Sequence, residues 1–328
     1  MTRSRRGWQM FRSLTLIGFV AGLLLSQAPV SQAARKPTGL TFVVVGDWGR
    51  NGDFHQRDVA AQMGRVANET KAAFVISTGD NFYDNGVTSV RSPQWQSSFE
   101  NIYTVAALQI PWYVVLGNHD YRGEPAVEVE YTRISKRWRM PARYFSQRFA
   151  LPGGGTAEFY FLDTQPFIEG YRRDSRYADV AKQSKQAQLS WLESSLAGSK
   201  ADWKIVVGHH PVFSRGRHGD TRELILDVQP LLERYGVQAY LNGHDHDMQH
   251  VVVNGISYLT SGAGSQPRPS GRGPATRFSL GNRSGFLAVE LTQQQLAGQF
   301  VDWTGKQVYA FVQPRATGSK VELPYSRP

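Results

Sequence analysis

In the stretch TFVVVGDWG, residues 41–49, an apolar run of strand length stops at a glycine followed by an aspartate. Residues 41–45 are mostly β-branched or aromatic, which favours a strand buried on both faces. Four further runs end in a glycine followed by Asp, Asn or His: 73–77, 112–116, 204–207 and 237–241. Amphipathic segments of helical period alternate with these runs, so the sequence predicts an α/β fold with buried strands.

The predicted helices cover residues 54–68, 95–108, 183–196 and 224–235. A second group of predicted strands has no helices between its members and comprises residues 157–162, 250–253, 256–259, 286–291 and 299–301. This pattern indicates an antiparallel or mixed sheet, with Asn254-Gly255 as a hairpin turn. Residues 165–181 and 262–281 are expected to be loops. We expect one domain over residues 40–315, followed by a tail at 316–328.

The first 33 residues predict an export signal rather than part of the fold. Four arginines precede an apolar stretch at 14–25, and a small-residue cleavage site follows at 31–33. Residues 4–8, SRRGW, resemble a twin-arginine signal, and ordinary secretion is the alternative. The apolar stretch is short for a membrane span, so no stable anchor is expected after cleavage, although an uncleaved anchor is the competing interpretation. We therefore expect a periplasmic or secreted protein.

Composition narrows the classes of ligand. The net charge of the 328-residue chain is +10, and loss of the four arginines in the signal leaves +6. A modest positive field favours anionic substrates, while the dispersed basic residues give no indication of nucleic-acid binding. The chain contains no cysteine, so it forms no disulfides and any metal site must use oxygen and nitrogen ligands.

Polar clusters follow the five predicted strands in the order GDWG, GDNFY, GNHD, GHHP and GHDH. The carboxyl ends of strands in an α/β sheet are where ligands collect, so these clusters could converge on one crevice. Each cluster alone is typical of a turn or a helix cap. Together they supply carboxylates and imidazoles, which suit a pair of metal ions that share a bridging carboxylate. The candidate ligands are Asp47, Asp80, Asn118, His209, His244 and His246.

The ordered motifs resemble the metallophosphoesterase, or calcineurin-like, superfamily, and more narrowly the small single-domain purple acid phosphatases of the mammalian tartrate-resistant type. The likeness extends over residues 41–313 and includes SKRW at 135–138, QLSWL at 188–192, YGVQAYL at 235–241 and SGAG at 261–264. The resemblance implies a four-layer α/β/β/α sandwich of two mixed sheets flanked by helices. It also implies a dinuclear metal site at the carboxyl ends of the strands.

The resemblance assigns a ligand set. Asp47, Tyr83 and His246 would bind Fe(III), and Asp80 would bridge the two ions. The second ion, Fe(II), Zn or Mn, would be held by Asn118, His209 and His244. Tyr83 would bind as a phenolate, which gives this family its purple colour and requires a strongly polarising ion.

The implied activity is that of an acid phosphatase that hydrolyses small anionic phosphomonoesters with a metal-bound hydroxide. His119 and His218 are the candidate proton donors, and Asp120 is expected to orient the ring of His119. We expect a monomer. The alternatives are a phosphodiesterase of the wider superfamily, disfavoured by Tyr83, and a non-catalytic di-iron redox protein, disfavoured by the two histidines.

The sequence departs from the mammalian pattern near these histidines. Arg217 replaces an acidic residue and is expected to lower the pKa of His218. His210 replaces a tyrosine, and we assign it no metal. The predicted loop at 165–181 carries Arg172, Arg173 and Arg176, which suggests a basic lid.

Overall fold

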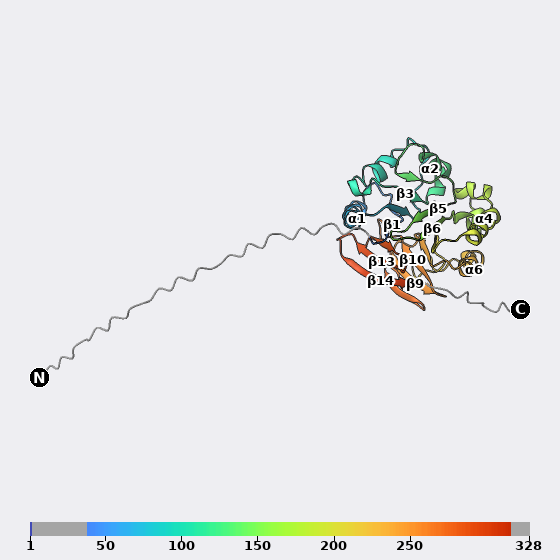
Figure 1. Cartoon of the computed structure of the whole chain (residues 1–328). Helices are drawn as coiled ribbons and strands as arrows, with labels where there is room; N and C mark the ends of the chain where they lie inside the picture. The colour runs from blue at the N-terminus through green and yellow to red at the C-terminus, as the bar shows by residue number, and fades with distance from the viewer. Residues whose placement is uncertain (2–37, 316–328) are drawn as a thin grey trace. The chain divides into compact units, whose positions relative to one another are not determined.

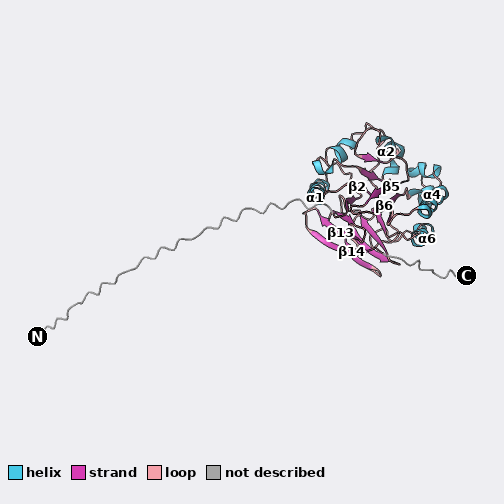
Figure 2. Cartoon of the chain, viewed as in Figure 1, coloured by secondary structure: helices cyan, strands magenta, loops and turns pink. Residues whose placement is uncertain are grey.

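The computed structural model describes Met1 and residues 38–315. The predicted export signal, apart from Met1, and the predicted tail at 316–328 lie outside the described residues. Residues 38–315 form two mixed seven-stranded sheets with helices on their outer faces (Figures 1 and 2). Within this part of the chain, no helix combines the length and the apolar character that crossing a membrane requires.

The first sheet has the strand order β14-β13-β12-β1-β2-β3-β4. Strands β1 to β4 run parallel, and β12 to β14 add antiparallel partners beside β1. The strands are β1 (Leu40–Val45), β2 (Phe74–Ser77), β3 (Trp112–Val114), β4 (Trp138–Arg139), β12 (Gly285–Leu291), β13 (Gln295–Asp302) and β14 (Gln307–Pro314). Every residue of β1 and β2 is buried, as expected for strands covered on both faces.

The second sheet has the order β11-β9-β10-β8-β7-β6-β5. Its four central strands are parallel, and antiparallel strands close both edges. The strands are β5 (Phe145–Ala150), β6 (Thr156–Phe161), β7 (Trp203–Val207), β8 (Ala239–Asn242), β9 (Met248–Val253), β10 (Ile256–Ser261) and β11 (Thr276–Leu280). Asn254 and Gly255 form the predicted hairpin turn, with φ values of 50° and 80°.

The helices lie around the periphery, with the strands between them (Figure 2). The α-helices are α1 (Gln56–Thr70), α2 (Pro125–Tyr131), α3 (Glu169–Arg172), α4 (Lys185–Gly198), α5 (Arg222–Asp227) and α6 (Gln229–Arg234). Shorter turns of other helical types are η1 (Trp95–Glu100), η2 (Ala106–Leu108), η3 (Asp120–Arg122), η4 (Gln165–Phe167) and η5 (Ser175–Lys182). Helix α4 begins at a Ser184 cap, whose hydroxyl accepts from the Ala187 N–H at 3.1 Å.

Aromatic side chains hold the two sheets together. Phe74 stacks on Phe42, which also belongs to the first sheet, with ring centroids 5.0 Å apart. It also stacks on Phe149 of the second sheet at 4.3 Å. Phe159 meets Phe74 edge-on at 5.6 Å. A second apolar core, including Leu192 of α4, lies between the second sheet and helices α4 to α6. The predicted four-layer arrangement is therefore confirmed.

Some predicted elements were wrong. Residues 95–108 form a π-helical turn and a 3₁₀ turn instead of one helix, because Trp95 and Phe99 are drawn into an aromatic core. The helix at 224–235 is interrupted after Asp227, where Pro230 lies in the first turn of α6 and lacks a backbone donor.

Two predicted loops also contain regular structure. Residues 165–181 form η4, α3 and most of η5, and residues 262–281 contain β11. Strands β4, β5 and β14 were not predicted. β5 and β14 are edge strands with alternating exposed residues, and β4 has only two residues, so none has a long apolar run.

Replacing Phe74 tests the packing between the sheets. Phe74→Ala should lower the free energy of unfolding by about 3–5 kcal/mol, because it leaves a cavity among three phenylalanine rings. Denaturant unfolding of the purified protein measures this change. Ile134→Ala, at a position that is 55% exposed, is the control and should change stability by less than about 0.5 kcal/mol. Equal effects of the two substitutions would contradict the proposed packing.

Candidate metal centre

The carboxyl ends of both sheets meet where β1, β2, β3, β7 and β8 stop. Asp47 follows β1, and the Gly46 N–H donates to the Ser261 carbonyl at the end of β10 at 2.8 Å. The His244 N–H, beyond β8, donates to Asp47 Oδ2 at 3.0 Å. These bonds join the two sheets at the candidate site. The structure brings together all seven residues that the sequence predicted as ligands.

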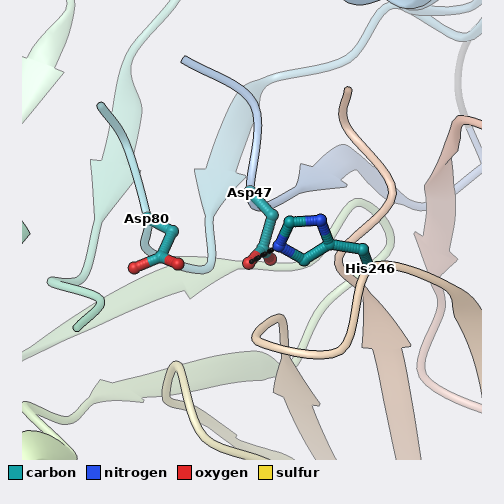
Figure 3. Close-up of side chains that lie close together, drawn as sticks. All are labelled: Asp47, Asp80 and His246. Atoms are coloured by element: carbon teal, nitrogen blue, oxygen red, sulfur yellow. Dashed lines mark ion pairs between the residues drawn. The ribbon is translucent and has the colours of Figure 1, made fainter. Parts of the chain in front are cut away.

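The first group of donors, here called the tyrosine group, consists of Asp47, Tyr83 and His246. The Tyr83 hydroxyl lies 3.0 Å from both Asp47 Oδ1 and His246 Nε2. It also lies 2.8 Å from Asp80 Oδ2. Figure 3 shows the side chains of Asp47, Asp80 and His246, which each offer a ligand atom within 4.8 Å of the others.

The second group of donors, here called the histidine group, consists of Asn118, His209 and His244. His209 Nε2 lies 3.2 Å from Asn118 Oδ1 and 3.1 Å from His244 Nδ1. The same nitrogen lies 3.5 Å from Asp80 Oδ1. One oxygen of Asp80 therefore faces each group, which is the arrangement required of a bridging carboxylate.

Backbone carbonyls fix the imidazole tautomers. His209 Nδ1 lies 2.9 Å from the Thr78 carbonyl, and His246 Nδ1 lies 2.8 Å from the Gln266 carbonyl. Because a carbonyl only accepts, both Nδ1 atoms carry the hydrogen and both Nε2 atoms present lone pairs to the site. Burial also lowers the pKa values of His209, His244 and His246, to about 3 for His246, which keeps the imidazoles neutral and able to coordinate.

This donor set suits bound cations. Asp47 and Asp80 are two buried carboxylates beside a phenol and neutral imidazoles. Burial and the charge of Asp80 raise the pKa of Asp47 well above its ordinary value. Burial and the two carboxylates likewise raise the pKa of Tyr83, against the opposing charge of Arg50. Cations bound between the groups would supply the missing positive charge, so the residues fit a dinuclear centre with O and N ligands.

Three of the donors have unusual backbone conformations. Asp47, Asp80 and His244 have φ values of 59°, 50° and 70°. Positive φ is uncommon outside glycine, and such conformations concentrate at ligand clamps. The Asp47 N–H donates to the Gly79 carbonyl at 3.0 Å, and the His119 N–H donates to Asp80 Oδ1 at 2.8 Å. Hydrogen bonds therefore hold the carboxylates in place.

Asp120 supports the loop that carries Asp80. Its carboxylate accepts from the N–H groups of Gly117 at 2.7 Å, Asn81 at 2.9 Å and Phe82 at 3.1 Å. The prediction that Asp120 orients the ring of His119 is therefore wrong. His119 Nδ1 instead lies 2.5 Å from the Asp84 carbonyl.

Sequence reasoning missed part of this support. The Asn81 amide donates to Asp120 at 3.2 Å and to Glu128 at 2.9 Å. Burial and the charge of Asp120 raise the pKa of Glu128 well above its usual value. The position of Asn81 within the GDNFY motif could have marked it as a residue of the site. Glu128 lies in a helix whose sequence resembles that of an ordinary surface segment.

The two candidate proton donors border different donor groups. His119 Nε2 lies 3.9 Å from Asp80 Oδ2, and the His119 ring packs against Tyr83 with centroids 4.3 Å apart. The ring of His218 packs against His244, with centroids 4.1 Å apart, and the backbone N–H of His218 donates to Asp245 Oδ1 at 2.9 Å. The site therefore has an imidazole beside each donor group.

The segment at 165–181 contacts the site through an aromatic residue. The Tyr171 hydroxyl lies 3.2 Å from His210 Nε2, and Thr164 Oγ1 lies 2.8 Å from His210 Nδ1. Both nitrogens of His210 thus have protein partners. Two of the expected lid arginines are paired within the segment: Arg173 with Glu169 at 3.0 Å and Arg176 with Asp174 at 2.6 Å. These contacts do not support a basic lid.

Sequence comparisons match this chain to known phosphatases. A family model for calcineurin-like phosphoesterases matches residues 40–248. Purple acid phosphatase 4 of Arabidopsis thaliana is 40% identical over 320 residues, covering 90% of this chain and 92% of the relative. Tartrate-resistant acid phosphatase type 5 of Oryctolagus cuniculus is 37% identical over 294 residues, covering 82% of this chain and 89% of the relative.

Solved structures share the fold. GAP50, the anchor in the inner membrane complex of Plasmodium, superposes with a TM-score of 0.75 at 25% identity, covering 87% of this chain and 92% of that chain. A purple acid phosphatase from yellow lupin seeds gives a TM-score of 0.62 at 16% identity, covering 84% of this chain and 54% of that chain. At that identity, the likeness to the lupin protein supports the fold alone.

Gly117 provides a test of the position of Asp80. A Cβ atom at Gly117 would lie 2.1 Å from Asp80 Oδ1, so Gly117→Ala must displace the carboxylate. We expect metal affinity to fall about 10–100-fold, as for other disturbances of the shell around a metal. Chelator competition, with metal content measured afterwards, tests this expectation. Gly198→Ala is the control, because a Cβ there would meet nothing within 4 Å. Equal metal retention in both variants would contradict the bridging position of Asp80.

Proposed function

The chain belongs to the purple acid phosphatases of the calcineurin-like phosphoesterase family, and we propose that the tyrosine group holds its ferric ion. The chain is an acid phosphatase with a dinuclear metal centre. In this proposal Asp80 bridges the ions, and the histidine group holds a divalent ion, Fe(II), Zn or Mn. Residues 40–315 form the proposed catalytic domain.

The position of the Asp80 carboxylate carries this proposal. Its Oδ2 faces the Tyr83 hydroxyl at 2.8 Å, and its Oδ1 faces His209 Nε2 at 3.5 Å. With the ion bound, Asp47 and the Tyr83 phenolate would supply two anionic oxygen ligands, which suit a trivalent ion. Asn118 offers a neutral oxygen in the histidine group, which suits a divalent ion.

The proposed substrates are small anionic phosphomonoesters. When bound, the two ions would neutralise phosphate oxygens and activate the attacking water. The leaving alkoxide needs a proton, and His119 and His218 are the proposed donors. The Asp84 carbonyl holds His119 Nδ1, so His119 Nε2 points toward Asp80. His218 is held by its ring contact with His244 and could also bind phosphate when protonated.

The surroundings of His218 favour catalysis at acidic pH. Burial lowers the pKa of His218, Asp245 opposes this effect, and Arg268 and Arg217 lower the pKa further. Arg217 therefore lowers the pKa of His218, as the sequence predicted. A lowered pKa makes the protonated, donating form of His218 prevail only as the pH falls, which suits an acid phosphatase.

We also propose that the protein is exported to the periplasm or the medium and acts as a monomer. The basic head, apolar stretch and cleavage site within residues 1–33 support export. The absence of cysteine is compatible with an oxidising compartment, because no thiol is left to react there.

Kinetics of two histidine variants test the proposed function. His119→Ala and His218→Ala should each reduce kcat on an aryl phosphomonoester about 10²–10⁴-fold, the usual contribution of a proton donor. His55→Ala is the control, because His55 stacks on Trp303 outside the donor groups at 4.2 Å. The wild type should cleave the monoester faster than the corresponding diester. Faster diester cleavage would favour the phosphodiesterase alternative, and unchanged kcat in both variants would exclude the assigned roles.

A further inference from the structure

Arg50 lies directly against the proposed phenolate ligand. Its guanidinium carbon is 3.7 Å from the centroid of the Tyr83 ring. The backbone N–H of Arg50 donates to the Trp48 carbonyl at 2.8 Å and to Gln56 Oε1 at 3.0 Å. The backbone N–H of Tyr83 donates to the Gly49 carbonyl at 2.9 Å. The loop after β1 thus fixes the backbones of both residues and holds the cation over the ring.

The charge of Arg50 is poorly balanced by carboxylates. Its side chain is only 10% exposed, and arginines are seldom buried without a partner. Its ion pair within residues 38–315 is with Asp84 at 3.6 Å, and the Asp84 side chain is 85% exposed. Such an exposed partner contributes little. The Arg50 Nε is buried and has no hydrogen-bond partner among the described residues. Arg50 faces two aromatic rings, and the Tyr83 ring, at 3.7 Å, is much nearer than the Phe54 ring, at 5.6 Å, so Tyr83 is the principal group that faces this cation.

We propose that Arg50 is a positioning residue that tunes the electronic properties of the ferric–Tyr83 pair. This inference rests on the proposed function, because it requires Tyr83 to bind iron as a phenolate. A buried cation at 3.7 Å from an anionic ring stabilises the electrons of that ring more strongly than it would in water. The band that arises when charge moves from phenolate to iron should therefore lie at shorter wavelength than it would without Arg50. The same positive charge should favour the ferrous form of the ion.

Substitutions of Arg50 can distinguish this role from simple space filling. A side chain that only covers Tyr83 could be replaced by a neutral residue of similar length without changing the energy of the ligand electrons. A cation cannot be replaced in this way. Methionine offers the neutral replacement, and lysine keeps the charge while losing the planar guanidinium.

Two measurements on the iron-loaded protein test the inference. They are the visible spectrum and the ferric/ferrous midpoint potential of the ion in the tyrosine group. In Arg50→Met, the band should move to longer wavelength, and the potential should fall, at unchanged iron content. Arg50→Lys should keep both values closer to those of the wild type. Arg57→Met is the matched control, because Arg57 is an exposed arginine whose guanidinium reaches the Asn51 carbonyl at 3.5 Å. It should leave the band and the potential unchanged.

The outcomes distinguish the inference from the proposed function. A purple wild type whose band and potential are the same in Arg50→Met would overturn the inference and leave ferric–phenolate binding intact. Equal shifts in the lysine and methionine variants would also overturn it, because charge would then not be the cause. If Arg50→Met fails to retain iron, comparison of Arg50→Gln with Arg50→Lys gives the same contrast of charge. A wild type that binds iron without a visible band would overturn both proposals.

Discussion

The position of the Asp80 carboxylate between the two donor groups determines whether the proposed metal centre can form. One oxygen of Asp80 lies 2.8 Å from the Tyr83 hydroxyl, and the other lies 3.5 Å from His209 Nε2. Tyr83 follows a strand of the first sheet, and His209 follows a strand of the second. Each donor group takes residues from both sheets, so a small displacement of one sheet relative to the other would pull both groups apart. The aromatic packing around Phe74 and the bond between Gly46 and Ser261 therefore serve the chemistry as well as stability.

The site is held in a conformation that its own side chains would not favour. Buried carboxylates face one another, and Asp47, Asp80 and His244 have positive φ. Backbone donors and carbonyls surrounding these residues provide the compensation. Asp120 accepts from the N–H groups of Asn81 and Phe82 in the loop after β2, and from the Gly117 N–H in the loop after β3. Bound cations would relieve the remaining imbalance of charge. The protein thus arranges the donors in advance, which reduces the rearrangement required when metal binds.

Most of the fold and most of the candidate site could be predicted from the sequence. A run such as residues 41–45 followed by Gly and Asp predicts both a buried strand and a polar group at its carboxyl end. The predictions failed where tertiary contacts outweighed local pattern, as in the broken segment at 95–108, where Trp95 and Phe99 enter a core. Asp120 was assigned to His119 from adjacency alone, and the structure turns it toward the opposite loop. The contact between Arg50 and Tyr83 depends on how two loops meet, which no local pattern encodes.

The visible absorption spectrum and metal content of the purified protein, with and without Tyr83→Phe, test whether Tyr83 binds a ferric ion as a phenolate. We expect an iron-containing purple protein whose visible band disappears in the variant, because phenylalanine offers no oxygen to the ferric ion. A colourless wild type that carries its full complement of metal but no iron would rule out ferric–phenolate binding at Tyr83.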